Sequence, residues 1–119
     1  PGKAGLSENI LAIRIVDGCL EHARIFNFFI NGKPETYLSS ADWMNRNLHR
    51  RIEVGFPIKD KVALEELDEL LELQLTDNTK ARLLNENLEH ITLEQKGKRI
   101  RSQTAFHKYL EIRERRQKV

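Results

Sequence analysis

One short stretch constrains the fold of this chain more than any other, because it joins an apolar run to a strong turn signal. Ile25–Ile30 is apolar except for one asparagine, and its β-branched and aromatic side chains predict a strand. The lack of alternation predicts burial on both faces. Asn31-Gly32 follows, and both residues tolerate positive φ, so we expect a hairpin. Lys33-Pro34 is expected to lengthen its loop before a second strand over Glu35–Ser39.

A short helix and a further strand are predicted directly after the hairpin. Asp42 can accept from a free amide and cap a helix over Trp43–Leu48. Residues 51–56 alternate in polarity, which predicts a strand that Pro57 ends. The side chains expected to face the core are those of Ile52, Val54 and Phe56.

The helix predicted from Asp60 has the clearest pattern in the chain. Asp60 caps it, acidic residues form its polar side, and Asp77-Asn78 interrupts it. Its apolar stripe is formed by Leu64, Leu67 and Leu71. A last helix is expected after an N-cap at Ser102. One side of that helix carries Phe106, Tyr109, Leu110 and Arg113.

The remaining segments carry weaker signals. Ser7 can serve as an N-cap, and apolar residues at helical spacing predict a helix from there to about Glu21. Cys19 is expected on this helix as a small buried side chain. The other elements expected are a short helix over 80–84, a turn over 85–87, a brief strand over 90–93 and a basic loop over 95–101.

The composition is typical of a single domain with a well-solvated surface, and the predicted strands and amphipathic helices indicate an α/β class. The chain has 119 residues, of which 39% are hydrophobic and 32% charged, and a net charge of +2, so any phosphate binding must come from local clusters. No apolar run approaches the roughly 18 residues of a membrane helix. The single cysteine excludes an intrachain disulfide framework and a multi-thiolate metal site. Because the predicted strands are few and the first residue is not Met, we expect a piece of a larger domain: a mixed sheet with flanking amphipathic helices.

His22 and Arg24 are the first candidates for chemistry. On a strand, residues two apart point the same way. A guanidinium offers a bidentate fork to phosphate, and an imidazole can attack or transfer a proton. The guanidinium also disfavours a charged imidazole, which keeps it nucleophilic. The competing interpretation is that a lone histidine near a strand end is a surface or core residue.

Ser39-Ser40-Ala41-Asp42 is the second candidate. Small residues that lead into a helix let amides and hydroxyls approach an anion. An ordinary N-cap sequence is the more common explanation, and the Asp42 carboxylate would repel phosphate, so we expect it to orient a neighbour. Further donors are available from Arg46, Asn47, Arg50 and Arg51, although a solvated face explains at least two of them.

Other chemistry finds little support. His49, His90 and His107 lack partners at ligand spacing, so no metal bound by this chain is expected. The basic loop over 96–101 contains no aromatic residue for base stacking. Neither a Walker-type glycine loop nor a Gly-x-Ser-x-Gly elbow is present.

A family resemblance is carried mainly by one run. It reads Tyr37-Leu38-Ser39-Ser40-Ala41-Asp42-Trp43-Met44, followed by Arg46-Asn47 and Arg51-Ile52-Glu53-Val54. Further matches are Ser7-Glu8-Asn9-Ile10, Ile15-Val16-Asp17 and Leu20-Glu21-His22. Together they resemble the C-terminal end of bacterial polyphosphate kinase over essentially the whole chain. This implies that residues 1–119 are the C-terminal part of the second of two tandem domains similar to the phospholipase D fold, without the N-terminal part of that domain or the preceding domains.

The match to the phospholipase D superfamily is incomplete. Its His-x-Lys pair corresponds to His22-Ala23-Arg24, with Arg in place of Lys, and its Gly-Ser-x-Asn turn corresponds to residues 39–42. The superfamily Asp, five residues after the Lys, would fall on Phe29. Phosphodiesterase chemistry is therefore in doubt, whereas the departure fits the kinase family.

The resemblance implies a mechanism and its cofactor. The kinase moves the terminal phosphate of ATP reversibly onto polyphosphate, with Mg²⁺ and through a phosphohistidine in the preceding domain. His22 would contact the transferred phosphate and assist as acid or base. The residues expected at ATP or phosphate are His22, Arg24, Ser39, Ser40, Arg46 and Asn47. ATP and Mg²⁺ would be bound mainly outside this chain, which is expected to fold but not to catalyse alone.

The resemblance also implies partners and a location. The partners are ATP or ADP, inorganic polyphosphate, the remaining domains and further copies in a homo-oligomer, without specific nucleic acid. The location is cytoplasmic, with some members at the periphery of the inner membrane. Two alternatives remain open: a module that binds polyphosphate or nucleic acid through residues 96–101 and the basic last helix, and a packing domain without catalysis.

Overall fold

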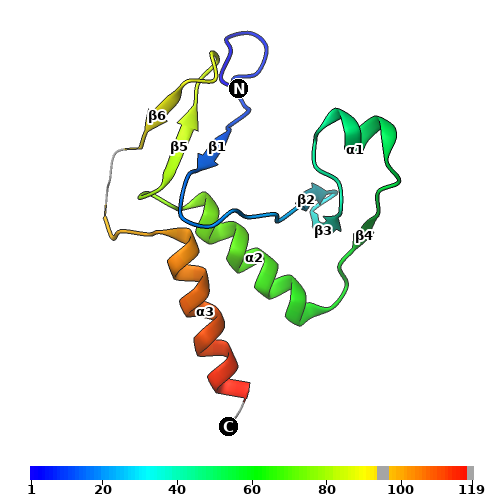
Figure 1. Ribbon diagram of the computed structural model, residues 1–119, viewed down its shortest axis with the longest axis vertical. Helices are drawn as coiled ribbons and strands as arrows, with labels where there is room; N and C mark the ends of the chain where they lie inside the picture. Colours follow the sequence, from blue (N-terminus) through cyan, green and yellow to red (C-terminus); the bar gives the residue numbers. More distant parts are fainter. Residues whose placement is uncertain (94–96, 118–119) are drawn as a thin grey trace. The chain divides into compact units, whose positions relative to one another are not determined.

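The chain has the α/β class that its sequence predicts. The computed structural model describes residues 1–93 and 97–117, and the strands and helices found there are labelled in Figure 1. In chain order they are β1 (Ile13–Ile15), β2 (Ile25–Ile30), β3 (Lys33–Ser39), α1 (Asn45–Arg50), β4 (Gly55–Pro57), α2 (Lys61–Leu75), β5 (Ala81–Leu84), β6 (His90–Thr92) and α3 (Ser102–Gln117).

The strands form two antiparallel sheets in place of the single mixed sheet expected from the sequence. The chain divides into two compact units, each with a three-stranded sheet of its own. The first unit combines residues 1–20 with residues 69–119 and contains the sheet β1-β5-β6. The second unit comprises Glu21–Asp68 and contains the sheet β2-β3-β4. All the pairings in both sheets are antiparallel.

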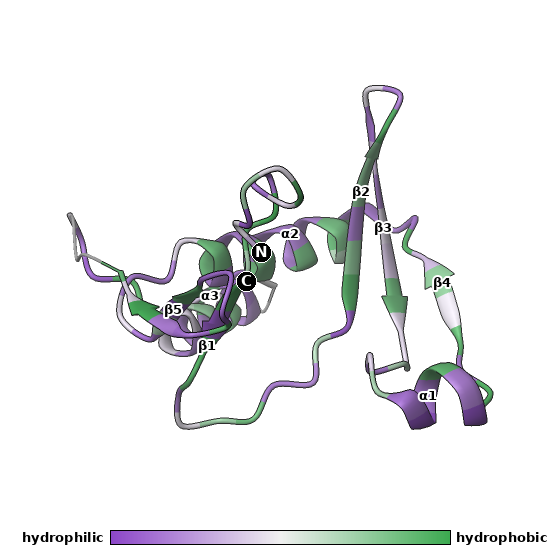
Figure 2. Ribbon diagram, turned by 90° about the horizontal axis from the view of Figure 1, so that it is seen from above, coloured by the Kyte–Doolittle hydropathy of each residue, from purple (hydrophilic) through white to green (hydrophobic). Residues whose placement is uncertain are grey.

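The predicted hairpin is confirmed in the second unit, and its turn is tighter than expected. Asn31 and Gly32 have φ of 49° and 77°, as a two-residue turn requires. Ile30 is paired with Lys33 and Phe29 with Pro34, so Lys33-Pro34 belongs to β3 rather than to the loop. The proline is tolerated because β4 pairs only with residues 37–39 of β3, beyond its position. Figure 2 shows the hairpin as a pair of extended strands.

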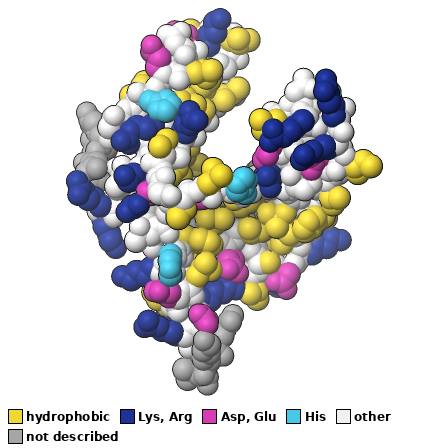
Figure 3. Space-filling model, in the orientation of Figure 1, with side chains coloured by type: hydrophobic (Ala, Val, Ile, Leu, Met, Phe, Trp, Pro, Cys, Tyr) yellow, Lys and Arg dark blue, Asp and Glu magenta, His cyan; other side chains and the backbone are white. Residues whose placement is uncertain are grey.

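The expected burial of this sheet is wrong. Phe29 is 77% exposed, Phe28 48% and Ile52 99%, and the predicted inward-facing Val54 and Phe56 are also exposed. With three strands, the six-residue α1 and only the first part of α2, the second unit has too few elements to cover both faces of its sheet. Figure 3 shows hydrophobic side chains over much of the visible surface.

The two predictions that follow the hairpin are only partly correct. A short helix is present, but α1 begins after Met44 without a side-chain cap, because the Asp42 carboxylate pairs with Arg24 instead. The strand predicted over residues 51–56 is reduced to β4. Only Gly55–Pro57 lies opposite β3, and its Pro57 is the last paired residue, as expected.

The weakest sequence predictions, in the first unit, are wrong. The expected helix between Ser7 and Glu21 is a turn followed by β1, and the expected helix over 80–84 is β5. β1 and β5 pair with each other, Ile13 opposite Leu83 and Ile15 opposite Ala81. Cys19 is an exposed free thiol rather than a buried filler. Strand pairing across the chain therefore overrides the local helical spacing.

Most of the remaining predictions, in both units, are confirmed. Asp60 caps α2, since its Oδ1 accepts from the Ala63 amide at 2.8 Å, and the helix ends before Asp77. The turn over 85–87 and the strand β6 are present. α3 begins at Ser102, but the predicted cap is wrong, because Ser102 is itself the first helical residue and its amide donates to Oδ2 of Asp77 at 2.7 Å. The carboxylate that accepts from the first amide of α3 thus belongs to a residue 25 positions earlier.

The basic loop predicted over residues 95–101 is described only in part. Residues 97–101 have no helix or strand, as predicted for the basic loop, whereas its residues 95 and 96 lie outside the described ranges. No described helix is long and apolar enough to cross a membrane.

Candidate functional site

All six predicted site residues lie in the second unit. His22 and Arg24 precede β2, Ser39 ends β3, and Ser40 follows it. The other two, Arg46 and Asn47, lie on α1. The Ser39 amide donates to the Arg24 carbonyl at 3.0 Å, so the pairing of the hairpin continues one step beyond β2 and brings the two candidate motifs side by side.

Arg24 is the centre of the site. Its Nε lies 2.6 Å from Oδ1 of Asp42, and its Nη2 lies 3.4 Å from Nδ1 of His22. The hydrogen bond from Arg24 lowers the pKa of Asp42, and the nearby charge of Arg46 adds to this effect. The same pair raises the pKa of Arg24. Asp42 therefore orients a neighbour, as expected from the sequence.

The contact between Arg24 and His22 also selects a form of the imidazole. A guanidinium has only donors, so Nδ1 must be the acceptor and a neutral ring carries its proton on Nε2. His22 is exposed. Its Nε2–H is therefore available to an oxygen of a ligand.

The serine corner, residues 39–42, is held by hydrogen bonds within the chain. The Ser39 amide donates to the Arg24 carbonyl, and the Ser40 amide donates to the Val54 carbonyl at 2.9 Å. The Ala41 amide donates to Oγ of Ser39 at 3.0 Å. α1 begins only at Asn45, so these amides do not form the open N-terminus that the sequence suggested. Contacts to an anion are thus left mainly to side chains.

Ser40 and Asn47 share one partner that the sequence reasoning did not select. Oγ of Ser40 donates to one oxygen of Glu53 and accepts from the Val54 amide at 3.0 Å. Nδ2 of Asn47 donates to the other Glu53 oxygen at 2.8 Å. Glu53 stands in the family run that begins at Arg51, and this was the only signal in the sequence that could have identified it.

Exposed cations surround this group. Arg46, Arg50 and Arg51 are all exposed, and the charges of Arg46 and Arg51 act on Asp42 and Glu53 respectively. Among residues 1–93 and 97–117, no group of three or more His, Cys, Asp or Glu side chains is placed to hold a metal ion. Positive charge from these arginines thus lies beside the two carboxylates.

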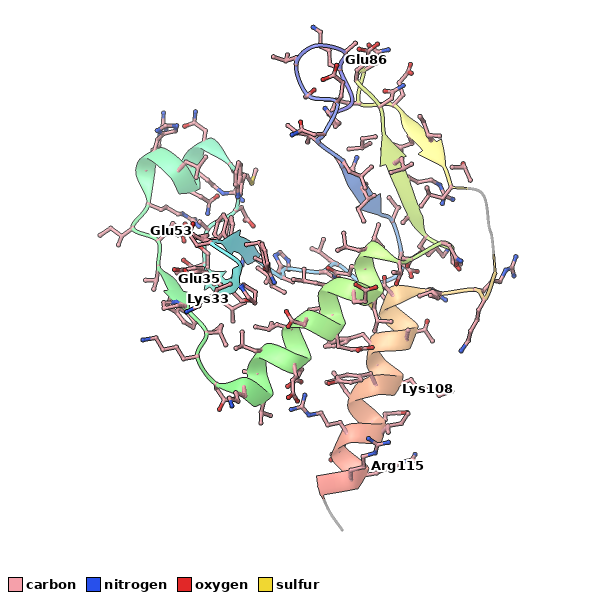
Figure 4. The ribbon with its side chains drawn as sticks, turned by 180° about the vertical axis from the view of Figure 1, so that it is seen from behind. Lys33, Glu35, Glu53, Glu86, Lys108 and Arg115 are labelled. Atoms are coloured by element: carbon pink, nitrogen blue, oxygen red, sulfur yellow. The ribbon has the colours of Figure 1, made fainter. Side chains whose placement is uncertain are left out.

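The alternative basic surface lies in the first unit. Arg101 is engaged by Asp17 through both Nε and Nη2, with Nε at 2.7 Å, which leaves it less able to grip a ligand. Lys108 and Arg115 project from α3 in Figure 4. Exposed cations are thus present there, and Arg101 and Lys108 line a pocket with Cys19 and His107.

Comparison with known proteins assigns the chain to a class. An imidazole that is oriented by a guanidinium and lies among exposed cations is suited to phosphate groups. Residues 1–103 match the family model described as "Polyphosphate kinase C-terminal domain 2". The chain therefore belongs to the polyphosphate kinase family, as part of its C-terminal region.

Individual relatives agree with this assignment. The chain is 44% identical over 111 residues to a polyphosphate kinase of Exiguobacterium sp., with 92% of this chain and 15% of the relative covered. It is 41% identical to one from Vibrio vulnificus, with 92% and 16% covered. The crystal structure of the Porphyromonas gingivalis enzyme matches with a TM-score of 0.84 at 43% identity, covering 92% of this chain and 17% of that one. The chain thus spans about a sixth of the length of these relatives.

Proposed function

We propose that this chain supplies one side of the active site of a polyphosphate kinase, which transfers the terminal phosphate of ATP reversibly to polyphosphate through a phosphohistidine. The observation that supports the proposal is the group His22–Arg24–Asp42, in which two hydrogen bonds fix a guanidinium beside an imidazole. Phosphoryl transfer depends mainly on positioning and charge stabilisation, which such a group can provide.

Arg24 has donors to spare for phosphate. A guanidinium has five N–H donors, and Asp42 and His22 take one each, so three remain for phosphate oxygens. The fixed fork prefers a planar pair of oxygens. Arg24 would therefore hold the phosphate and stabilise the charge that develops on it.

His22 would act on the phosphate that moves. Its Nε2–H can donate to an oxygen of that group, while the phosphoryl acceptor is a histidine outside this chain and ADP is the leaving group. When transfer runs backwards, the same N–H stays bound to the phosphate. Arg46 is close enough to act on Asp42 and would meet a neighbouring phosphate.

Magnesium would not be held by the residues described here. The carboxylates of Asp42 and Glu53 already accept from Arg24, Ser40 and Asn47, and no described cluster provides a set of ligands. The ion would arrive with the nucleotide and neutralise its phosphates. Without the remaining domains, this chain alone should bind anions weakly and show no synthesis.

The test is His22→Ala in the intact enzyme that contains this chain. We expect polyphosphate synthesis to fall by roughly 10²- to 10³-fold, the range for the loss of one donor that stabilises charge in the transition state. His49→Ala is a matched control, because His49 is an exposed histidine on α1, and it should keep full activity. A fully active His22→Ala enzyme would refute the proposal.

A further inference from the structure

We propose that Glu53 is the positioning residue of this site: it holds the serine corner through Ser40 and Asn47, and thereby sets the place of Asp42, Arg24 and His22, without touching the substrate. The inference rests on the proposed function, because it assigns a role within the same site. Figure 4 shows Glu53 on the segment that joins α1 to β4.

Both oxygens of the Glu53 carboxylate are occupied. Oε2 accepts from the Ser40 hydroxyl, and Oε1 accepts from the Asn47 amide at 2.8 Å. These two donors come from different elements, the end of the hairpin and the middle of α1. One carboxylate therefore links the serine corner to the helix that follows it.

The link is reinforced by the neighbouring backbone. The Ser40 amide donates to the Val54 carbonyl at 2.9 Å, and the Val54 amide donates to Oγ of Ser40 at 3.0 Å. Ser40 is thus hydrogen-bonded to both Glu53 and Val54. Asn47 is 4% exposed, so its bond to Glu53 is shielded from competing water.

From this anchor a short series of contacts leads to the imidazole. Asp42 lies two residues after Ser40 and binds Arg24 at 2.6 Å, and Arg24 in turn lies 3.4 Å from His22. A shift of the corner would therefore move the carboxylate that orients Arg24. Small misplacements of reacting groups lower rates steeply.

The charge of Glu53 argues against a role as phosphate ligand or as acid. The hydrogen bonds from Ser40 and Asn47 lower its pKa, and the charges of Arg51 and Arg24 contribute. An ionised carboxylate whose two oxygens already accept bonds repels an anion. The Ser40 hydroxyl proton is likewise directed at Glu53, so Ser40 would act through the corner rather than on phosphate.

These roles predict a distinct kinetic signature in the intact enzyme. Glu53→Gln removes one acceptor and one negative charge, so kcat should fall about tenfold while KM for ATP stays equal or decreases. Ser40→Ala should change kcat in the same direction. The double variant Ser40→Ala/Glu53→Gln should be no slower than Glu53→Gln, because both act through one link.

Controls separate positioning from other causes. Glu65→Gln changes an exposed glutamate on α2 and should leave both parameters unchanged. Glu53→Asp keeps the charge but is shorter, and should retain an intermediate kcat. If Glu53→Gln does not fold, Ser40→Ala and Glu53→Asp carry the test alone.

The outcomes that overturn the inference differ from those that overturn the proposed function. A raised KM for ATP at unchanged kcat would show that Glu53 or Ser40 contacts the substrate. Unchanged kinetics in Glu53→Gln, Ser40→Ala and the double variant would show that the link is dispensable. In either case an inactive His22→Ala enzyme leaves the proposed function standing. A fully active His22→Ala enzyme would refute both the proposed function and this inference.

Discussion

Arg24 and Asp42 are 18 positions apart in the sequence, yet Nε of the arginine lies 2.6 Å from Oδ1 of the aspartate. The bond crosses the open end of the hairpin, where the segment before β2 meets the corner after β3. The side chains of Arg24 and Asp42 are 25% and 36% exposed, so solvent screens the pair and its contribution to stability is small. Its importance lies in orientation, because it directs the guanidinium at both His22 and a ligand.

The orientation of Arg24 can be tested with a substitution that keeps the charge. In Arg24, Nε contacts Asp42 and Nη2 contacts His22. Lysine has a single ammonium group and cannot reproduce this fixed pair of donors. We expect Arg24→Lys to lower kcat/KM for ATP by about tenfold or more, without loss of folding. Normal kinetics in the Arg24→Lys enzyme would show that only the charge matters. Lys59→Arg, an exposed change in the same unit, is the control.

The buried carboxylate of Asp77 should make the first unit sensitive to acid. Burial raises its pKa, but the backbone amides of Ser102, Lys80 and Thr79 outweigh this effect and bring the pKa to about 2, from 3.8. A lowered pKa in the folded state stabilises the fold above the unfolded value, and this stabilisation is lost as pH falls through the folded one. Asp77 should thus contribute about 2 kcal/mol near neutral pH, which disappears between about pH 4 and pH 2.

This contribution is measurable by urea unfolding at several pH values. Asp77→Asn should lower the free energy of unfolding at pH 7, because the NH₂ group of the asparagine faces a backbone N–H donor where a carboxylate oxygen accepted. It should also flatten the dependence of this free energy on pH below 4, because the asparagine does not titrate. Asp60→Asn is the control, since asparagine caps a helix about as well as aspartate. An equal loss in both variants would contradict the special role of Asp77.

The hairpin should be destabilised by a substitution at Gly32, in its turn, and not by one at Gly55, in β4. Gly32 has φ of 77°, which costs an L-residue roughly 1 kcal/mol, although open space surrounds the position. Gly55 lacks a positive φ, and an added Cβ would meet only the Leu38 carbonyl at 3.9 Å. Gly32→Ala should therefore speed hydrogen exchange of the β2 and β3 amides, whereas Gly55→Ala should not. Equal exchange in both variants would argue against the tight turn.

The position of the anion-binding surface distinguishes an active-site part from a general polyanion binder. Arg46 and Lys98 are both exposed cations, one in the second unit beside Asp42 and one in the first. In the intact enzyme, Arg46→Gln should weaken the binding of inorganic polyphosphate and reduce its salt dependence, and Lys98→Gln should change neither. The reverse result would favour the basic loop and α3 as the binding surface.

Much of the local structure could be predicted from the sequence, because its causes lie close together along the chain. Asn31 and Gly32 determine the hairpin turn through their own φ angles, and Asp60 caps α2 three residues ahead of the amide that it accepts from. The apolar stripe of α2 and the start of α3 at Ser102 were likewise visible. His22 and Arg24 were paired by strand geometry, although both precede β2, and Asp42 was expected to orient a neighbour that only the structure identifies as Arg24.

The rest was decided by contacts between distant parts of the chain. β1 has helical spacing by itself, and becomes a strand because Ile13 pairs with Leu83, 70 positions away. Asp42 caps nothing, because a guanidinium competes for its carboxylate more strongly than the amides of a six-residue helix. Glu53 gained its role only when folding placed Ser40 and Asn47 on the two oxygens of its carboxylate. Short-range propensities fix turns and helices, whereas hydrogen bonds between side chains require the tertiary structure that brings donor and acceptor together.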